Sequence, residues 1–164
     1  LKMEHPDLAL IMIDYIGLIT TGNKKVESRQ VEVSEISRQL KALARELEIP
    51  ILVLCQLSRN VEQAKTGGRK PVISDLRESG SIEQDADVIM LLSRPDYQNK
   101  DTSNMKALTK DVNEPIINEN GETISQVTVT VGKNRNGPIG DVKLIFTKTI
   151  GRFDEQANND DYGD

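Results

Sequence analysis

Two short apolar runs, each ending in a polar residue, most constrain how this chain can fold. The first covers residues 8–13 and ends at Asp14, and the second covers residues 51–55 and ends at Gln56. Such runs are typical of strands buried on both faces of a parallel sheet, and we expect the first to be a central strand. Between them, an amphipathic helix from Ser28 to Glu48 is predicted, because apolar residues recur at spacings of three and four: Val33, Ile36, Leu40, Leu43 and Leu47. Together these elements predict a β–α–β unit with parallel strands and a right-handed crossover.

The second half of the chain predicts a third strand and then a hairpin. Residues 88–92 form another apolar run, which predicts a third buried strand. Residues 127–131 alternate in polarity, residues 136–138 read Asn-Gly-Pro and predict a turn, and residues 142–146 supply the hairpin partner. Residues 95–124 lack sustained periodicity and predict a long surface excursion. The predicted fold class is therefore α/β, with parallel strands and helices followed by a C-terminal β-hairpin.

Length and composition exclude several classes of protein. The chain has 164 residues, the length of one ordinary domain. Its first apolar run is far shorter than the roughly 20 residues that cross a bilayer, and no secretory signal pattern precedes it. A single cysteine, Cys55, cannot form an internal disulfide, which favours a reducing, cytoplasmic compartment.

Charge is concentrated at the C-terminal end of the chain. Residues 154–164 hold five acidic residues and no basic one, which predicts a disordered acidic tail. Without them, the chain has 21 acidic residues against 21 Lys and Arg, so the net charge of -5 argues neither for nor against a nucleic-acid partner. We therefore expect one partial domain over residues 1–153 and a tail over residues 154–164.

Asp14 and Gln56 are the first candidates for chemistry. Ligands of open parallel sheets bind outside the carboxyl ends of the strands, so we expect both side chains to face one crevice. A carboxylate there suits the support of a hydrated Mg²⁺ ion beside nucleotide phosphates, and a neutral amide suits sensing a γ-phosphate or orienting water. The alternative is that Asp14 begins a turn and Gln56 ends a strand.

A second candidate lies within residues 75–87. Arg77, Ser79 and Gly80 offer a guanidinium, a hydroxyl and approachable backbone amides, which together suit binding of a phosphate. The alternative is a capped helix start with a solvated face, which the neighbouring acidic residues favour.

A third candidate is the pair Lys133 and Arg135, two residues apart at the tip of the predicted hairpin. At this spacing, two strand residues point to the same side, so both cations could reach one anion. The alternative is a basic, solvated turn. His5 and Cys55 have no partners at metal-ligand spacing, and we expect both to be structural.

Five segments together resemble the bacterial replicative DNA helicase, the DnaB family, in order and approximate spacing: residues 10–15, 40–44, 56–59, 75–87 and 133–137. The resemblance spans most of residues 8–153. It implies the later half of a RecA-like P-loop NTPase core in an ATP-hydrolysing enzyme that uses ATP and Mg²⁺. It further implies a homohexameric ring that translocates on single-stranded DNA and unwinds duplex at the replication fork in the cytoplasm. Primase and a helicase loader are the implied protein partners.

The resemblance also implies roles for single residues. Asp14 is similar to the Walker B aspartate that supports Mg²⁺, and Gln56 to the glutamine that couples nucleotide state to DNA-facing loops. Lys133 and Arg135 are similar to the basic pair that reaches the ATP site of the neighbouring subunit, with Arg135 as the arginine finger.

Arg77, Glu78 and Gly80 resemble residues of the family's DNA-binding loop, which contacts the phosphate backbone. This chain departs from the family pattern because the phosphate-binding sequence G-x-x-x-x-G-K-[ST] is absent from it. Residues 67–70, Gly-Gly-Arg-Lys, lack both the spacing and the hydroxyl. The excursion at residues 95–124 also looks longer than the family's connection.

We therefore expect the chain, which begins at Leu1, to be a fragment that runs from Walker B onward. Without a P-loop, we expect it to be inactive as an ATPase on its own. Two other interpretations stay open at this point: a relative of RecA-type recombinases, and a non-catalytic assembly or DNA-contact module.

Overall fold

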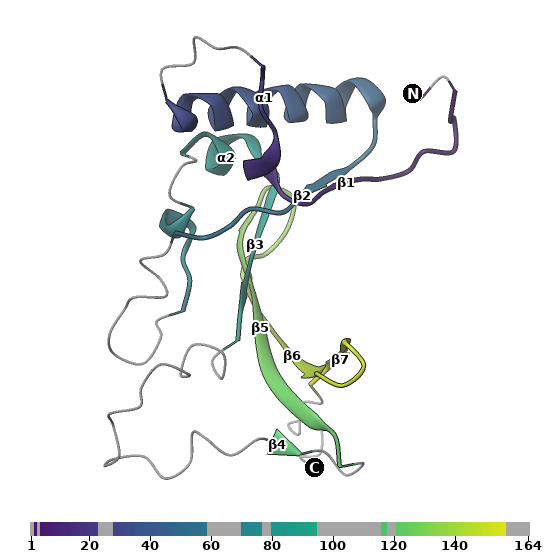
Figure 1. Ribbon diagram of the computed structural model, residues 1–164, viewed down its shortest axis with the longest axis vertical. Coiled ribbons are helices and arrows are strands. Elements are labelled where there is room, and N and C mark those ends of the chain that lie inside the picture. Colours follow the sequence, from purple (N-terminus) through teal and green to yellow (C-terminus); the bar gives the residue numbers. More distant parts are fainter. Residues whose placement is uncertain are drawn as a thin grey trace. The chain divides into compact units, whose positions relative to one another are not determined.

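The computed structural model describes residues 2, 4–22, 28–58, 70–76, 80–94, 116–117 and 121–156. The chain divides into two units, and Figure 1 labels their helices and strands. The helical unit comprises Leu1–Asn60 and Val72–Ile89, and the hairpin unit comprises Val61–Pro71 and Met90–Asp164.

The helical unit is built on the predicted β–α–β unit. Strand β1 (Ile11–Ile13) pairs in parallel with β2 (Ile51–Val53), and helix α1 (Arg29–Leu47) connects the two strands. Beyond the strands, the Leu54 amide donates to the Ile13 carbonyl at 2.9 Å and the Ile16 amide donates to the Leu54 carbonyl at 3.0 Å. The parallel pairing therefore continues up to the residues that follow both strands.

Helix α1 begins and ends where its sequence predicts. The Ser28 hydroxyl accepts a hydrogen bond from the Val31 amide at 3.3 Å, which satisfies one of the unpaired amides of the first turn. Glu48 ends the helix in the left-handed conformation, with φ of 52°, and Pro50 follows. The predicted helix over residues 28–48 is confirmed, with its outermost residues as the caps.

The core of the helical unit lies between α1 and the short 3₁₀ helix η1 (Ile16–Leu18) that follows β1. Ile16, Val33 and Ile36 are 4%, 3% and 3% exposed. Partly buried apolar residues pack around them: Ile19, Leu40, Val53, Cys55 and Ile82. The spacing of apolar residues along α1 thus buries one helix face, as predicted.

The expectation of a central strand buried on both faces is wrong for β1. Among the described residues, β1 pairs only with β2. Met12 is 68% exposed and Leu52 is 37% exposed, because the described core with α1 covers only the opposite face of this two-stranded sheet.

No helix in the described part of the chain is both long and apolar enough to span a membrane.

Helix α2 is held on α1 by polar contacts as well as by the core. It covers Gly80–Asp85, and its Asp85 carboxylate accepts a hydrogen bond from the Ser37 hydroxyl at 2.8 Å. One turn further along α1, the Lys41 ammonium group pairs with Asp87. Two residues of α1 therefore bind the last residue of α2 and an acidic residue just beyond that helix.

The hairpin unit contains a sheet in which the strand order is β3-β5-β6-β7, with β4 also paired to β5. The predicted hairpin is confirmed as the antiparallel pair β5 and β6, in which Val127 lies opposite Leu144. The strands of this sheet have these bounds: β3 Val88–Ser93, β4 Ile116–Ile117, β5 Thr123–Asn134, β6 Gly140–Thr147 and β7 Arg152–Glu155.

Strand β3 differs from its prediction. It belongs to the sheet of the hairpin, not to the parallel pair, and it is buried on one face only. Its buried residues are Ile89 and Leu91, whereas the alternate residues are exposed: Val88, Met90 and Leu92. An apolar run of this length thus forms a strand with a single covered face.

The predicted C-terminal tail overlaps a strand. Asp154 and Glu155 lie in β7, where Asp154 is opposite Ile145 and Glu155 is opposite Leu144. Residues 157–164 of that tail lie outside the described residues, as does most of the excursion at 95–124.

One carboxylate in the first turn of α1 bridges the helix to the segment after η1. Glu32 accepts hydrogen bonds from the Thr21 amide at 2.9 Å and the Thr21 hydroxyl at 3.3 Å, and it pairs with Arg29. These hydrogen bonds, chiefly the one from the Thr21 amide, lower the pKa of Glu32 below its ordinary value. The ionised form is therefore the one that stabilises the fold.

We predict that Glu32→Gln lowers the free energy of unfolding of the chain in a pH-dependent way. Since the folded-state pKa of Glu32 is lowered, its stabilisation is complete above the ordinary Glu pKa and is lost as pH falls through the folded-state value. The difference from wild type in urea unfolding is expected at about pH 7, and it should shrink as pH falls through the lowered folded-state pKa of Glu32.

The matched control is Glu35→Gln, which lies about one helical turn after Glu32 on α1. The hydrogen bond described for Glu35 is one that it accepts from Gln39 within the same helix. An equal loss of stability at every pH for Glu32→Gln would contradict the ionic role.

Candidate functional site

A pocket of about 470 Å³ lies where β1 and β2 end. Its lining comes from the residues that directly follow the two strands: Asp14, Tyr15, Leu54, Cys55 and Gln56. Carboxyl ends of parallel strands meet at one edge of a sheet, which is the reason for this convergence. The expectation that Asp14 and Gln56 face one crevice is confirmed, since both residues line this pocket.

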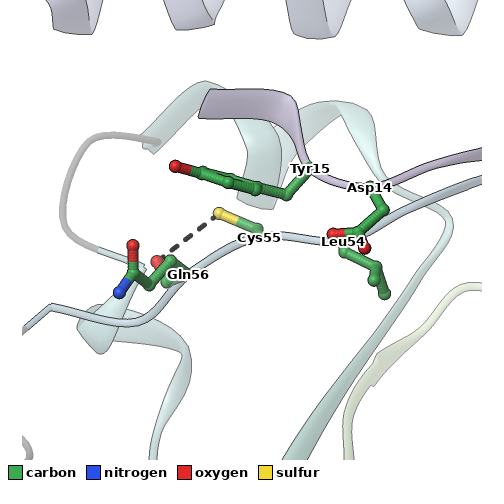
Figure 2. A pocket seen from close by; sticks show the side chains of 5 residues that line it. All are labelled: Asp14, Tyr15, Leu54, Cys55 and Gln56. Atoms are coloured by element: carbon green, nitrogen blue, oxygen red, sulfur yellow. Dashed lines mark hydrogen bonds between the residues drawn. The ribbon is translucent and has the colours of Figure 1, made fainter. Parts of the chain in front are cut away.

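The pocket has a polar group at each side and an aromatic ring between them. Figure 2 shows Asp14 at one side and Gln56 at the other, with the Tyr15 ring and the Cys55 thiol between. Both Asp14 and Gln56 are exposed, whereas Tyr15 and Cys55 are half-buried. The Cys55 thiol donates a hydrogen bond to the Gln56 carbonyl at 3.7 Å. The two polar groups are therefore accessible to a solute at the end of the sheet.

Gly17 makes room for the Tyr15 ring. A Cβ atom at Gly17 would overlap with Tyr15 Cε2, at a separation that real side chains do not adopt. The ring therefore lies across the backbone of η1, and any side chain at position 17 would displace it. The sequence pattern does not single out Tyr15 and Gly17; the available signal is their position one and three residues after Asp14.

The donors around Asp14 fit one kind of metal ion. No group of three or more His, Cys, Asp or Glu side chains gathers among the residues that the structure describes. Asp14 is the one carboxylate among the described residues that line the pocket, so a metal ion bound there would have it as its protein ligand. Mg²⁺ keeps several water ligands and binds through one or two carboxylates together with substrate phosphates, so this donor set suits a magnesium nucleotide.

The second candidate segment is divided by the structure. Gly80 is the exposed first residue of α2, whereas Arg77 and Glu78 lie outside the described residues. Asp75, at the start of the segment, is 5% exposed, and its carboxylate accepts a hydrogen bond from the Val72 amide at 2.8 Å. Asp75 thus stabilises the 3₁₀ turn η2 (Ile73–Asp75).

The third candidate pair does not lie within one strand. Lys133 is half-buried near the end of β5, which stops at Asn134, and Arg135 is the exposed first residue of the turn. Lys133 and Arg135 therefore do not share one strand, which the expectation from period-two spacing assumed. This basic pair belongs to the hairpin unit, whereas the pocket belongs to the helical unit.

Asn134 shapes the hairpin turn. Its side chain accepts a hydrogen bond from the Asn136 amide at 3.2 Å and donates one to the Pro138 carbonyl at 3.3 Å. A Cβ atom at Gly137 would lie 2.7 Å from Asn134 Nδ2, so the glycine allows this close approach. The turn that carries Arg135 is therefore held by its own side-chain hydrogen bonds.

Comparison with known proteins gives one consistent family. Residues 1–155 match the model of the DnaB-like helicase C-terminal domain. The replicative DNA helicase DnaB of Geobacillus stearothermophilus is 49% identical over 153 residues, which are 93% of this chain and 29% of that relative. The chain thus spans less than a third of the length of this curated relative.

Solved structures agree with the sequence comparison. A DnaB-like replicative helicase, whose structure was described together with its interactions with primase, matches with a TM-score of 0.72 and 38% identity over 95% of this chain and 32% of its own. A second solved structure, described as an ATPase domain, matches with a TM-score of 0.71 and 38% identity over 95% of this chain and 48% of its own. The chain therefore belongs to the family of the DnaB-like helicase C-terminal domain.

Proposed function

We propose that this chain is part of the motor of a replicative DNA helicase, the later half of a RecA-like P-loop NTPase core. The protein that contains it hydrolyses ATP with Mg²⁺, translocates on single-stranded DNA and unwinds duplex at the replication fork in the cytoplasm. The observation that carries this proposal is the meeting of Asp14 and Gln56 in one pocket, in a chain of this family. The ring is a homohexamer, and primase and a helicase loader bind it.

Asp14 and Gln56 have separate roles in this proposal. The exposed Asp14 carboxylate would hold Mg²⁺, and the ion would supply neutralisation of phosphate charge for hydrolysis. Gln56 is uncharged and both donates and accepts hydrogen bonds, so it responds to the presence of a γ-phosphate without competing for the metal ion.

A short backbone route leads from Gln56 toward the proposed DNA loop. The Ser58 amide donates a hydrogen bond to the Asp75 carbonyl at 2.9 Å. Ser58 lies two residues after Gln56, and Asp75 lies two residues before Arg77. A shift of the Gln56 backbone is therefore passed to the segment in which Arg77, Glu78 and Gly80 contact the DNA backbone.

Lys133 and Arg135 act across a subunit interface in this proposal. A cation supplied to a neighbouring ATP site stabilises transition-state charge and makes hydrolysis depend on assembly of the ring.

Of the two other interpretations of the sequence, the one as a relative of RecA-type recombinases loses support, because the matched family is that of helicases. The non-catalytic module remains the alternative that the following experiments test.

We predict that Arg135→Ala in the full-length protein lowers ATP hydrolysis by about 10³- to 10⁵-fold while nucleotide binding persists. Rings mixed from this variant and Asp14→Asn subunits should regain part of the activity, because some interfaces then combine an intact Asp14 with an intact Arg135. Steady-state hydrolysis across mixing ratios measures the recovery.

Arg152→Ala is the matched control, since Arg152 is an exposed arginine of the same sheet that pairs with Asp154. Wild-type activity of Arg135→Ala, or mixed rings that recover nothing, would refute the shared interface.

We predict that Arg77→Ala weakens binding of single-stranded DNA without sequence preference. Each neutralised phosphate contributes about -0.7 to the slope of log affinity against log salt, so loss of one contact per subunit makes this slope shallower. Affinity at several salt concentrations measures it, with Arg45→Ala at the exposed end of α1 as the control. An unchanged slope in a folded variant would remove Arg77 from the DNA contacts.

A further inference from the structure

We propose that Arg29 and Glu32, on the first turn of α1, are positioning residues that set the geometry of the Asp14 pocket. Neither residue lines the pocket. They act through the backbone of residues 16–21. This segment directly follows Asp14 and Tyr15, which line the pocket. This inference rests on the proposed function of Asp14.

The Arg29 guanidinium binds three backbone carbonyls of this segment. Nη1 donates to the Ile19 carbonyl at 2.9 Å, and Nη2 donates to the Gly17 carbonyl at 2.7 Å and to the Ile16 carbonyl at 3.3 Å. The planar guanidinium presents several donors in a fixed arrangement, which suits binding of several carbonyls at set positions. A lysine would keep the charge but not this geometry.

Glu32 completes the arrangement from the same helical turn. It pairs with Arg29, and it accepts hydrogen bonds from both the amide and the hydroxyl of Thr21. The side chains of Arg29 and Glu32 are 32% and 14% exposed, so these contacts are partly shielded from solvent. The two residues form a clamp, here called the Arg29–Glu32 clamp, that holds residues 16–21 at both ends.

The clamped segment directly follows the pocket lining, and backbone hydrogen bonds tie it to two of the lining residues. The Leu18 amide donates to the Tyr15 carbonyl at 3.0 Å, and the Ile16 amide donates to the Leu54 carbonyl at 3.0 Å. Gly17, whose carbonyl Arg29 binds, lies against the Tyr15 ring. A movement of Gly17 therefore moves Tyr15, and with it the backbone that carries the Asp14 carboxylate.

A simpler role for the same residues makes a different prediction. If Arg29 and Glu32 were only a pair of opposite charges that stabilises the start of α1, Arg29→Lys would preserve that function, because a lysine can pair with Glu32. If the carbonyl contacts matter, Arg29→Lys loosens residues 16–21 although the charge is kept.

The test is Arg29→Lys, measured in two ways. In the full-length protein, we expect the half-saturating Mg²⁺ concentration for ATP hydrolysis to rise, or kcat to fall, by up to about 10- to 100-fold, the loss that follows removal of a direct hydrogen-bond partner of a metal ligand. In the 164-residue chain, we expect faster hydrogen exchange of the Leu18 and Ile19 amides, which bond to Tyr15 and Ile16.

The matched control is Arg38→Lys on the same helix, where the exposed arginine donates to the Ser34 carbonyl at 3.2 Å. It should leave both readouts at wild-type values. Glu32→Gln is the second variant, expected to move both readouts in the same direction as Arg29→Lys. If Arg29→Lys and Glu32→Gln both behave like Arg38→Lys, the inference is wrong.

Asp14→Asn separates this inference from the proposed function. If Asp14→Asn abolishes hydrolysis while both clamp variants keep the wild-type dependence on Mg²⁺, only the positioning inference fails. If Asp14→Asn leaves hydrolysis and its dependence on Mg²⁺ unchanged, the proposed role of Asp14 fails, and the positioning inference fails with it.

Discussion

The helical unit depends on the burial of Ile16 against Val33 and Ile36. This contact fixes the turn after β1 to one face of α1, and each buried side chain of this size contributes about 1.5–3 kcal/mol. Because Ile16 lies only two residues after Asp14, the hydrophobic core also fixes where the pocket begins. The polar contacts of Arg29 and Glu32 act on the same segment, so the core and the clamp hold one short piece of backbone from two sides.

The elements that follow from local patterns were the most predictable. The spacing of Val33, Ile36 and Leu40, with Ser28 before them and Pro50 after them, determines α1 within one turn. The sheet to which a strand belongs is not a local property. The run at 88–92 has the same apolar character as the two runs of the parallel pair, but it pairs in the sheet of the hairpin, because strand partners lie far apart in the sequence.

The candidate site divides in the same way. The sequence predicts that Asp14 and Gln56 converge, because parallel strands of one β–α–β unit end at the same edge. The sequence does not predict that the Tyr15 ring lies between them. That placement depends on a contact with Gly17, where a Cβ atom would overlap with the ring. The acidic residues of the 75–87 segment illustrate a further limit: Asp85 and Asp87 bind Ser37 and Lys41, more than forty positions away, and no local pattern reveals those partners.

We propose that the ends of β1 and β2 form the site for a magnesium nucleotide. The most direct measurement is a structure of the full-length protein with Mg²⁺ and a non-hydrolysable ATP analogue. We predict that it will show the Asp14 carboxylate in contact with the ion or its water ligands, and the Gln56 amide within hydrogen-bond distance of the terminal phosphate or its attacking water. A nucleotide bound away from both residues, in a protein that unwinds DNA, would show that the ends of β1 and β2 are not the nucleotide site.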